Sequence, residues 1–304
     1  MSTAARLALY GVALLAVFGV MFVAGRALIP DSTVADWTKE AKSDDHESMG
    51  GSEDGHESMG SGSVTENVRG LSMEQDGYTL SPVESPVKAG EPGELSFRVL
   101  DPEGRPFTDF SESHEKELHL IIVRSDGAEF RHVHPRLDRA TGTWSVSWSW
   151  PTGGSYRVFA DFVPATEDAP NVTLTRNVEV AGEFTPIDPE ISRRDSVDGF
   201  EAALTGNLAA GRSEALAIEI TRDGKPVEEL QPYLGAFGHL VALREGDLAY
   251  LHVHPEGAHA EPGDLSGPEI SFMAEAPTPG RYLLYLDFKV DGEVHTAEFV
   301  LEAR

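Results

Sequence analysis

Three histidines recur at one spacing in two parts of the sequence, and imidazole nitrogen is a common ligand of transition metals. Both sets follow the pattern H-x12-H-x-H-P and are offset by 120 residues, from 119 to 239. They are His119, His132 and His134 in the first copy, and His239, His252 and His254 in the second. The pattern favours metal binding in each copy.

A β-hairpin would bring the rings of one set together. A two-residue turn at Asp126-Gly127 puts His119 opposite His134. His132 and His134 are two residues apart, so both point to one face of the sheet. Opposed Cβ atoms lie about 4.5–5.5 Å apart, which suits three ligands of one copper ion or, as a second choice, zinc. A shift of one residue in the register would turn His119 away.

The same face of this hairpin also carries Ile121, Val123 and Phe130. The alternative interpretation is therefore that a duplication kept the histidines as buried structural residues. If they bind metal they must be neutral, and binding should weaken as the pH falls through about 6.5.

Weaker candidate ligands lie outside the two sets. They are His114, His295, His46, Met49, His56 and Met59. The last four belong to a short repeat in which imidazole and thioether groups suit copper, although a solvated spacer explains it too. His114 has Leu234 as its counterpart in the second copy, and His295 has Thr173 as its rough counterpart.

The elements that must position these residues are short strands. Runs rich in Val, Leu, Phe and Tyr alternate with turns of Gly and Pro, and no long stretch has helical periodicity. Asp76-Gly77-Tyr78 matches Asp198-Gly199-Phe200 in the second copy. We therefore predict an all-β fold of two tandem β-sandwiches, with domain one at 71–185 and domain two at 186–304.

The N-terminal region has a different character. Leu7 to Gly25 is uncharged and, as a helix, would span about 28 Å, close to the thickness of a membrane core. We predict a transmembrane anchor within 1–30, with a cleaved signal peptide as the alternative. Residues 31–70 are acidic and poor in apolar residues, which predicts a disordered linker. The chain would cross the cell membrane once, with its body outside the cytoplasm.

Composition excludes several classes of function. The 304 residues include 51 acidic and 24 basic side chains, a net charge of -27, which argues against nucleic-acid binding. The chain has no Cys, which excludes disulfides and thiolate chemistry. No phosphate-binding loop or nucleophile elbow is present, so we do not expect an enzyme.

The segment H-x4-H-L-I-I-V at 114–123, followed by F-x-H-V-H-P at 130–135, resembles a group of bacterial exported or membrane-anchored proteins with tandem repeats. Some of these accompany copper-handling genes. The resemblance implies immunoglobulin-like or copper-carrier-like sandwiches. The function expected is a membrane-anchored extracytoplasmic copper carrier, buffer or sensor. The alternative is a structural or protein-interaction module that binds no metal.

Overall fold

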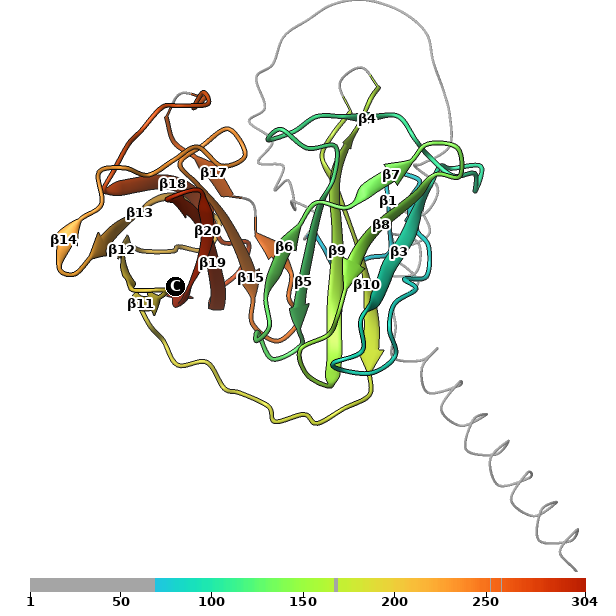
Figure 1. Ribbon diagram of the computed structural model, residues 1–304, viewed down its shortest axis with the longest axis horizontal. Coiled ribbons are helices and arrows are strands. Elements are labelled where there is room, and N and C mark those ends of the chain that lie inside the picture. The colour runs from blue at the N-terminus through green and yellow to red at the C-terminus, as the bar shows by residue number, and fades with distance from the viewer. Residues whose placement is uncertain (1–68, 167–168, 252, 258) are drawn as a thin grey trace, which may run out of the picture. The chain divides into compact units, whose positions relative to one another are not determined.

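The computed structural model describes residues 69–166, 169–251, 253–257 and 259–304, and this part of the chain contains strands and turns without a helix (Figure 1). Domain one has β1 (Glu74–Gln75), β2 (Tyr78–Leu80), β3 (Gly93–Leu100), β4 (Phe110–Ser111), β5 (His119–Arg124), β6 (Arg131–Val133), β7 (Arg136–Asp138), β8 (Thr143–Trp148), β9 (Gly154–Pro164) and β10 (Val172–Val180). Domain two has β11 (Arg194–Val197), β12 (Phe200–Gly206), β13 (Ser213–Arg222), β14 (Lys225–Pro226), β15 (Gly238–Arg244), β16 (Tyr250–Leu251), β17 (Val253–Pro255), β18 (Glu269–Glu275), β19 (Gly280–Val290) and β20 (Glu293–Ala303).

The two domains repeat one sheet arrangement. In domain one, β1-β2-β3-β8-β7 form one sheet and β10-β9-β5-β6 the other, where β4 also pairs with β9. In domain two, the corresponding sheets are β11-β12-β13-β18-β17, with β14 on β13, and β16-β15-β19-β20. For the described residues, the prediction of an all-β fold with two repeated domains is confirmed.

The predicted anchor and nearly all of the predicted linker lie outside the described residues. The same holds for the candidate ligands His46, Met49, His56 and Met59. Within the described residues, no helix is both long and apolar enough to cross a membrane.

Each domain has its own apolar core, produced by alternation along the strands. In β3, Leu95, Phe97 and Val99 are buried while their neighbours are more exposed, as expected for a strand with one face inward. In β13, Leu216 and Ile218 do the same in domain two. Complete burial of one such side chain stabilises the fold by about 1.5–3 kcal/mol.

A third apolar cluster joins the two domains. All six residues of β5 are buried, because its two faces pack against different partners. Leu120 and Ile122 lie in the core of domain one. Ile121 and Val123 point the other way and pack with residues of β15, such as Val241, from domain two. The outer faces of the β5 and β15 sheets therefore form the domain joint.

Aromatic pairs reinforce the joint on both sides. Phe130 stacks on Tyr285 with ring centroids 4.0 Å apart, and Phe159 lies 5.9 Å from Tyr250. Such pairs add about 0.5–1.5 kcal/mol each to the effect of burial. The Tyr285 hydroxyl also donates a hydrogen bond of 2.6 Å to the Gly127 carbonyl, which ties β19 to the β5–β6 turn.

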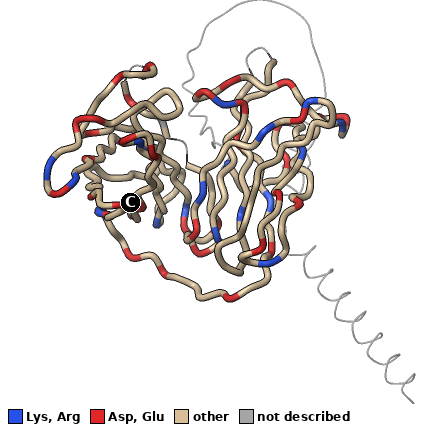
Figure 2. The backbone as a smooth tube through the Cα atoms, viewed as in Figure 1, with Lys and Arg blue, Asp and Glu red and all other residues tan. Residues whose placement is uncertain are grey.

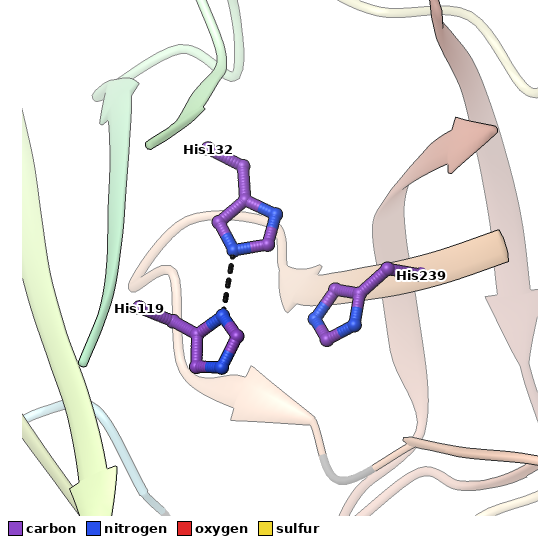
Figure 3. A group of neighbouring side chains, drawn as sticks. All are labelled: His119, His132 and His239. Carbon is purple, nitrogen blue, oxygen red and sulfur yellow. Dashed lines mark hydrogen bonds between the residues drawn. The ribbon is translucent and has the colours of Figure 1, made fainter. Parts of the chain in front are cut away.

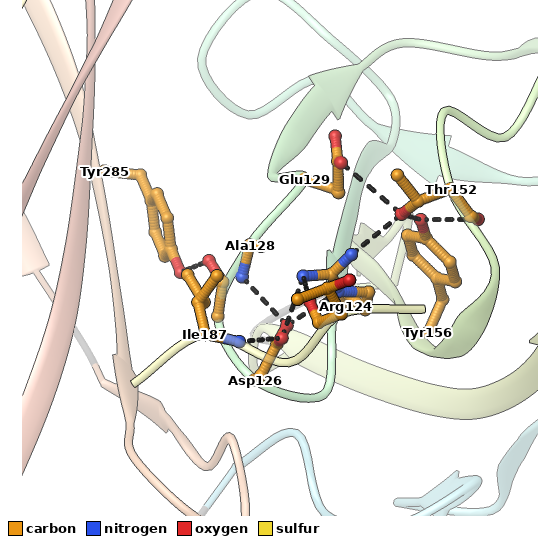
Figure 4. A network of polar contacts seen from close by, with 10 residues as sticks. Arg124, Asp126, Ala128, Glu129, Thr152, Tyr156, Ile187 and Tyr285 are labelled. Carbon is orange, nitrogen blue, oxygen red and sulfur yellow. Dashed lines mark hydrogen bonds and ion pairs between the residues drawn. The ribbon is translucent and has the colours of Figure 1, made fainter. Parts of the chain in front are cut away.

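Polar contacts fix that turn (Figure 4). The Arg124 guanidinium pairs with Asp126 at 2.8 Å, and Asp126 accepts a hydrogen bond from the backbone N–H of Ile187 in the interdomain connection. Gly127 has a φ of +90°, and a Cβ there would lie 2.6 Å from a methyl group of Leu283. Both the turn conformation and the contact with domain two therefore require glycine.

Candidate metal centre

The β5–β6 hairpin places the histidines of the first set. Leu120 pairs with Val133 and Ile121 with His132. One step further along this register, His119 lies opposite His134, which is the predicted pairing. The turn itself is not the predicted two-residue turn, because the Gly127 N–H donates to the Arg124 carbonyl and the Arg124 N–H to the Ala128 carbonyl. His132 and His134 flank Val133, so both rings lie on the face of the hairpin that Ile121 and Val123 also occupy.

The three imidazoles of domain one converge. The Nδ1 atom of His119 is 3.1 Å from Nε2 of His132 and 3.2 Å from Nε2 of His134. The rings of His132 and His134 have centroids 4.9 Å apart. Three nitrogens from two neighbouring strands therefore surround one small volume.

A fourth imidazole comes from domain two. His239 is the second residue of β15. Its ring stacks on that of His119, with centroids 5.5 Å apart and ring planes 6° from parallel. One nitrogen from each of His119, His132 and His239 lies within 4.8 Å of the other two (Figure 3). We call His119, His132, His134 and His239 the histidine cluster.

This arrangement differs from the sequence prediction of one separate site in each domain. His239 joins the domain-one histidines because the sheet faces that carry them pack against each other across the joint. His252 and the His254 side chain lie outside the described residues. The backbone at His254 belongs to β17 and pairs with Met273 of β18, in the opposite sheet from β15.

Hydrogen bonds to fixed acceptors orient two of the rings. The Nε2–H of His119 donates to the Ser113 carbonyl at 2.9 Å, which leaves its Nδ1 as an acceptor. The Nδ1–H of His132 donates to the Asp287 carboxylate at 2.8 Å, so Nε2 is the nitrogen of this ring that faces His119. The two facing nitrogens, Nδ1 of His119 and Nε2 of His132, are 3.1 Å apart.

Burial disfavours the charged form of three rings of the cluster. It lowers the pKa of His119 to about 3 and that of His134 to about 3, and the nearby His132 adds to both effects. Burial also lowers the pKa of His239 well below its usual value. At neutral pH these rings therefore hold no extra proton.

Two ring nitrogens face one acceptor. Nε2 of His132 and Nε2 of His134 both lie within hydrogen-bonding distance of Nδ1 of His119. A cation bound among the three nitrogens would take the place of the proton in these contacts. With metal–nitrogen bonds of about 2.0–2.1 Å, nitrogens at these separations subtend about 100° at the ion, near the tetrahedral value.

A cavity of about 210 Å³ adjoins the cluster and is lined from both domains, by His114, His119, Asp161, His239 and Tyr250 among others. The His114 ring has its centroid 5.5 Å from that of His239 and 6.2 Å from that of His119. The structure thus places this weaker candidate at the edge of the cluster.

His295, the other weaker candidate in the described residues, lies elsewhere. Its Nδ1 contacts Asp198 at 2.9 Å, and its ring packs on Phe200 and Phe288. Its assumed counterpart is also different. Thr173 bonds to Asp161 as Thr296 bonds to Asp287, so Thr173 and Thr296 are the equivalent residues.

Asp287 is the functional residue that the sequence interpretation missed. Its carboxylate is buried, contacts His132 across the joint and accepts a hydrogen bond from Thr296 at 2.7 Å. The signal was present, because Asp161-Phe162 and Asp287-Phe288 repeat between the domains. Its contact with His132 follows only from how the domains pack.

Comparison with protein families gives one match, a domain of unknown function (DUF8832), at residues 73–181 and again at 195–304. The chain belongs to this family. Its two copies of the family domain carry the two histidine sets, one in each copy. No curated protein matches the chain.

Several solved structures are similar to the chain at low identity. The adhesin InvE of Yersinia pseudotuberculosis is 10% identical, with a TM-score of 0.21 over 74% of this chain and 58% of that one. Salmonella alpha-2-macroglobulin is 16% identical, with a TM-score of 0.25 over 78% of this chain and 15% of that one. A putative membrane anchored protein from Corynebacterium diphtheriae is 10% identical, with a TM-score of 0.22 over 75% and 59%. The chain thus spans well under two thirds of these proteins, and they carry no argument about its function.

Proposed function

We propose that the histidine cluster binds a transition-metal ion, with copper as the first choice and zinc as the second. The observation that carries the proposal is the convergence of three imidazole nitrogens: Nδ1 of His119 lies 3.1 Å from Nε2 of His132 and 3.2 Å from Nε2 of His134. Imidazole nitrogens gathered in this way are a common ligand set for copper and zinc.

Two further features support the proposal. Asp287 supports His132 from behind, as carboxylates commonly do for metal-bound histidines. Acidic side chains are spread over the turns and the interdomain connection (Figure 2). With a net charge of -27, the chain attracts cations from solution and raises their local concentration.

The physiological role we propose is that of a carrier, buffer or sensor rather than an enzyme. Anchoring by Leu7 to Gly25 and a position outside the cytoplasm remain predictions from the sequence. The His/Met arm, with His46, Met49, His56 and Met59, would collect copper for the cluster.

The alternative is a structural or protein-interaction module. One contact favours it: the buried pair of His132 and Asp287 links the two domains directly, at 2.8 Å. In that case the histidines fasten the joint and never bind metal.

Metal titration of the full chain distinguishes these functions. The protein is prepared without a histidine tag, stripped with a chelator and titrated by calorimetry with Cu(II), Zn(II) and Cu(I). We expect the wild type to bind one more tight equivalent than the double variant His119→Ala/His132→Ala. His295→Ala removes a buried histidine outside the cluster and should bind as the wild type does.

Equal stoichiometry and affinity in the wild type and the double variant would overturn the proposal and leave the structural module. Circular dichroism of both variants checks that they keep the β fold.

A further inference from the structure

Asp287 connects the cluster to domain two. It lies in β19 between His239 on β15 and Thr296 on β20, so its carboxylate is on the face that meets domain one. One oxygen accepts from His132 at 2.8 Å and the other from Thr296 at 2.7 Å. The side chains of Asp287 and His132 are 4% and 0% exposed, so water does not compete for this contact.

The contact controls the atom that would bind metal. While Asp287 accepts the Nδ1–H of His132, Nε2 is the nitrogen of this ring that faces His119 and is left to bind a metal. A carboxylate in this position also makes the opposite nitrogen a stronger donor to a metal. Without Asp287, the His132 ring is free to rotate and to carry its proton on Nε2, where the proton excludes the ion.

We propose that Asp287 is a positioning residue for His132, so that the cluster has its full metal affinity only while the two domains are docked. The inference rests on the proposed metal function. Domain one supplies three imidazoles of the cluster, whereas the group that orients His132 belongs to domain two. Because linkage is reciprocal, a bound ion stabilises the docked joint by the same factor by which docking raises its affinity.

The test is Asp287→Asn in the full chain. Thr296 continues to donate to the amide oxygen, so the amide NH2 faces Nδ1 of His132 and drives the proton to Nε2. We expect Cu(II) or Zn(II) affinity, measured by chelator competition, to fall by roughly 10- to 100-fold. In the metal-free protein, nitrogen NMR of the imidazoles should show His132 change from the Nδ1–H to the Nε2–H tautomer.

Two further variants keep the test sharp. Asp287→Asn/Thr296→Val lets the amide turn its oxygen to His132, and should recover most of the lost affinity. Asp198→Asn alters a similar Asp–His pair, with His295 outside the cluster, and should leave affinity unchanged. If Asp287 only holds the two domains together, Asp287→Asn/Thr296→Val has lost two contacts and should bind metal more weakly than Asp287→Asn does.

The outcomes separate the two claims. A wild type that binds no metal overturns both the proposed function and this inference. A wild type that binds, together with an Asp287→Asn variant of equal affinity or an unchanged His132 tautomer, overturns only the role of Asp287. An equal loss of metal affinity in Asp287→Asn and in Asp198→Asn would also overturn the positioning role of Asp287.

Discussion

Domain one and domain two have equivalent strands but present different groups to the histidine cluster. Domain one gives His119, His132 and His134, while the described part of domain two gives His239 and Asp287. The residues after the hairpin explain part of this difference. In domain two, the chain passes at 252 from β16 to β17, which pairs with β18 in the other sheet.

The buried carboxylates show the same asymmetry. Asp161 and Asp287 occupy equivalent places opposite His119 and His239. Asp161 accepts hydrogen bonds from Thr173 and Asn171 within its own domain, whereas Asp287 reaches His132 across the joint. Equivalent carboxylates of a duplicated fold can thus take different partners, one within its own domain and one across the joint.

The largest expected effect comes from breaking the joint that brings the copies together. Phe159 is fully buried there, and Phe159→Ala should lower the free energy of unfolding by about 3–5 kcal/mol, as is usual for a large buried ring. Val87→Ala, at a side chain of domain one that is 72% exposed, is the control and should change it by less than about 0.5 kcal/mol. Urea denaturation measures both, and equal effects would mean that the joint adds no stability.

Acid should destabilise the metal-free protein through its neutral histidines. The folded pKa of His119 is about 3, below the value of about 6.5 in an unfolded chain. The unfolded state therefore binds more protons between these values, so stability is complete above pH 6.5 and is lost as the pH falls toward 3. The expected slope is about 1.4 kcal/mol per pH unit for His119 alone.

Denaturation at several pH values should show a smaller slope for His119→Asn than for the wild type. An unchanged slope would contradict the neutral state of His119. The same low pKa revises the sequence prediction that metal binding weakens through pH 6.5. We now expect proton competition at His119 and His134 to begin at lower pH.

The smallest effect should come from giving domain one, at the edge of the histidine cluster, the residue that domain two has at the equivalent position. His114 and Leu234 occupy the same left-handed position, with φ of 49° and 59°, in equivalent tight turns. His114→Leu should weaken metal binding by only about threefold, or about 0.7 kcal/mol, because this ring lies at the edge. A loss as large as that of the double variant His119→Ala/His132→Ala would make His114 a ligand.

Much of domain one could be predicted from local sequence. The alternation of His132, Val133 and His134 after a hairpin turn is enough to predict that His119 lies near both histidines. The details of the turn were not predicted: Arg124 pairs with Ala128, and one extra residue before β6 restores the expected register. Repeated landmarks such as Asp-Gly-aromatic also predicted two all-β domains. These features depend on residues close in the chain.

The rest depends on contacts that no local pattern contains. His239 meets His119 only because the outer faces of β5 and β15 pack together, and Asp287 meets His132 for the same reason. The sequence correctly placed Ile121 and Val123 on the same face as the histidines. It did not predict that residues of domain two cover this face.

The aromatic pairs at the joint have a consequence for a single copy of this repeat. Phe130 and Tyr250 are repeat equivalents, as are Phe159 and Tyr285, so the contacts Phe130–Tyr285 and Tyr250–Phe159 are one contact made twice in exchanged roles. Such exchange defines an isologous interface, the kind found in two-fold symmetric homodimers. The stacked His119 and His239 lie where the symmetry axis would pass. A single copy of this repeat is therefore expected to form the same joint by self-association.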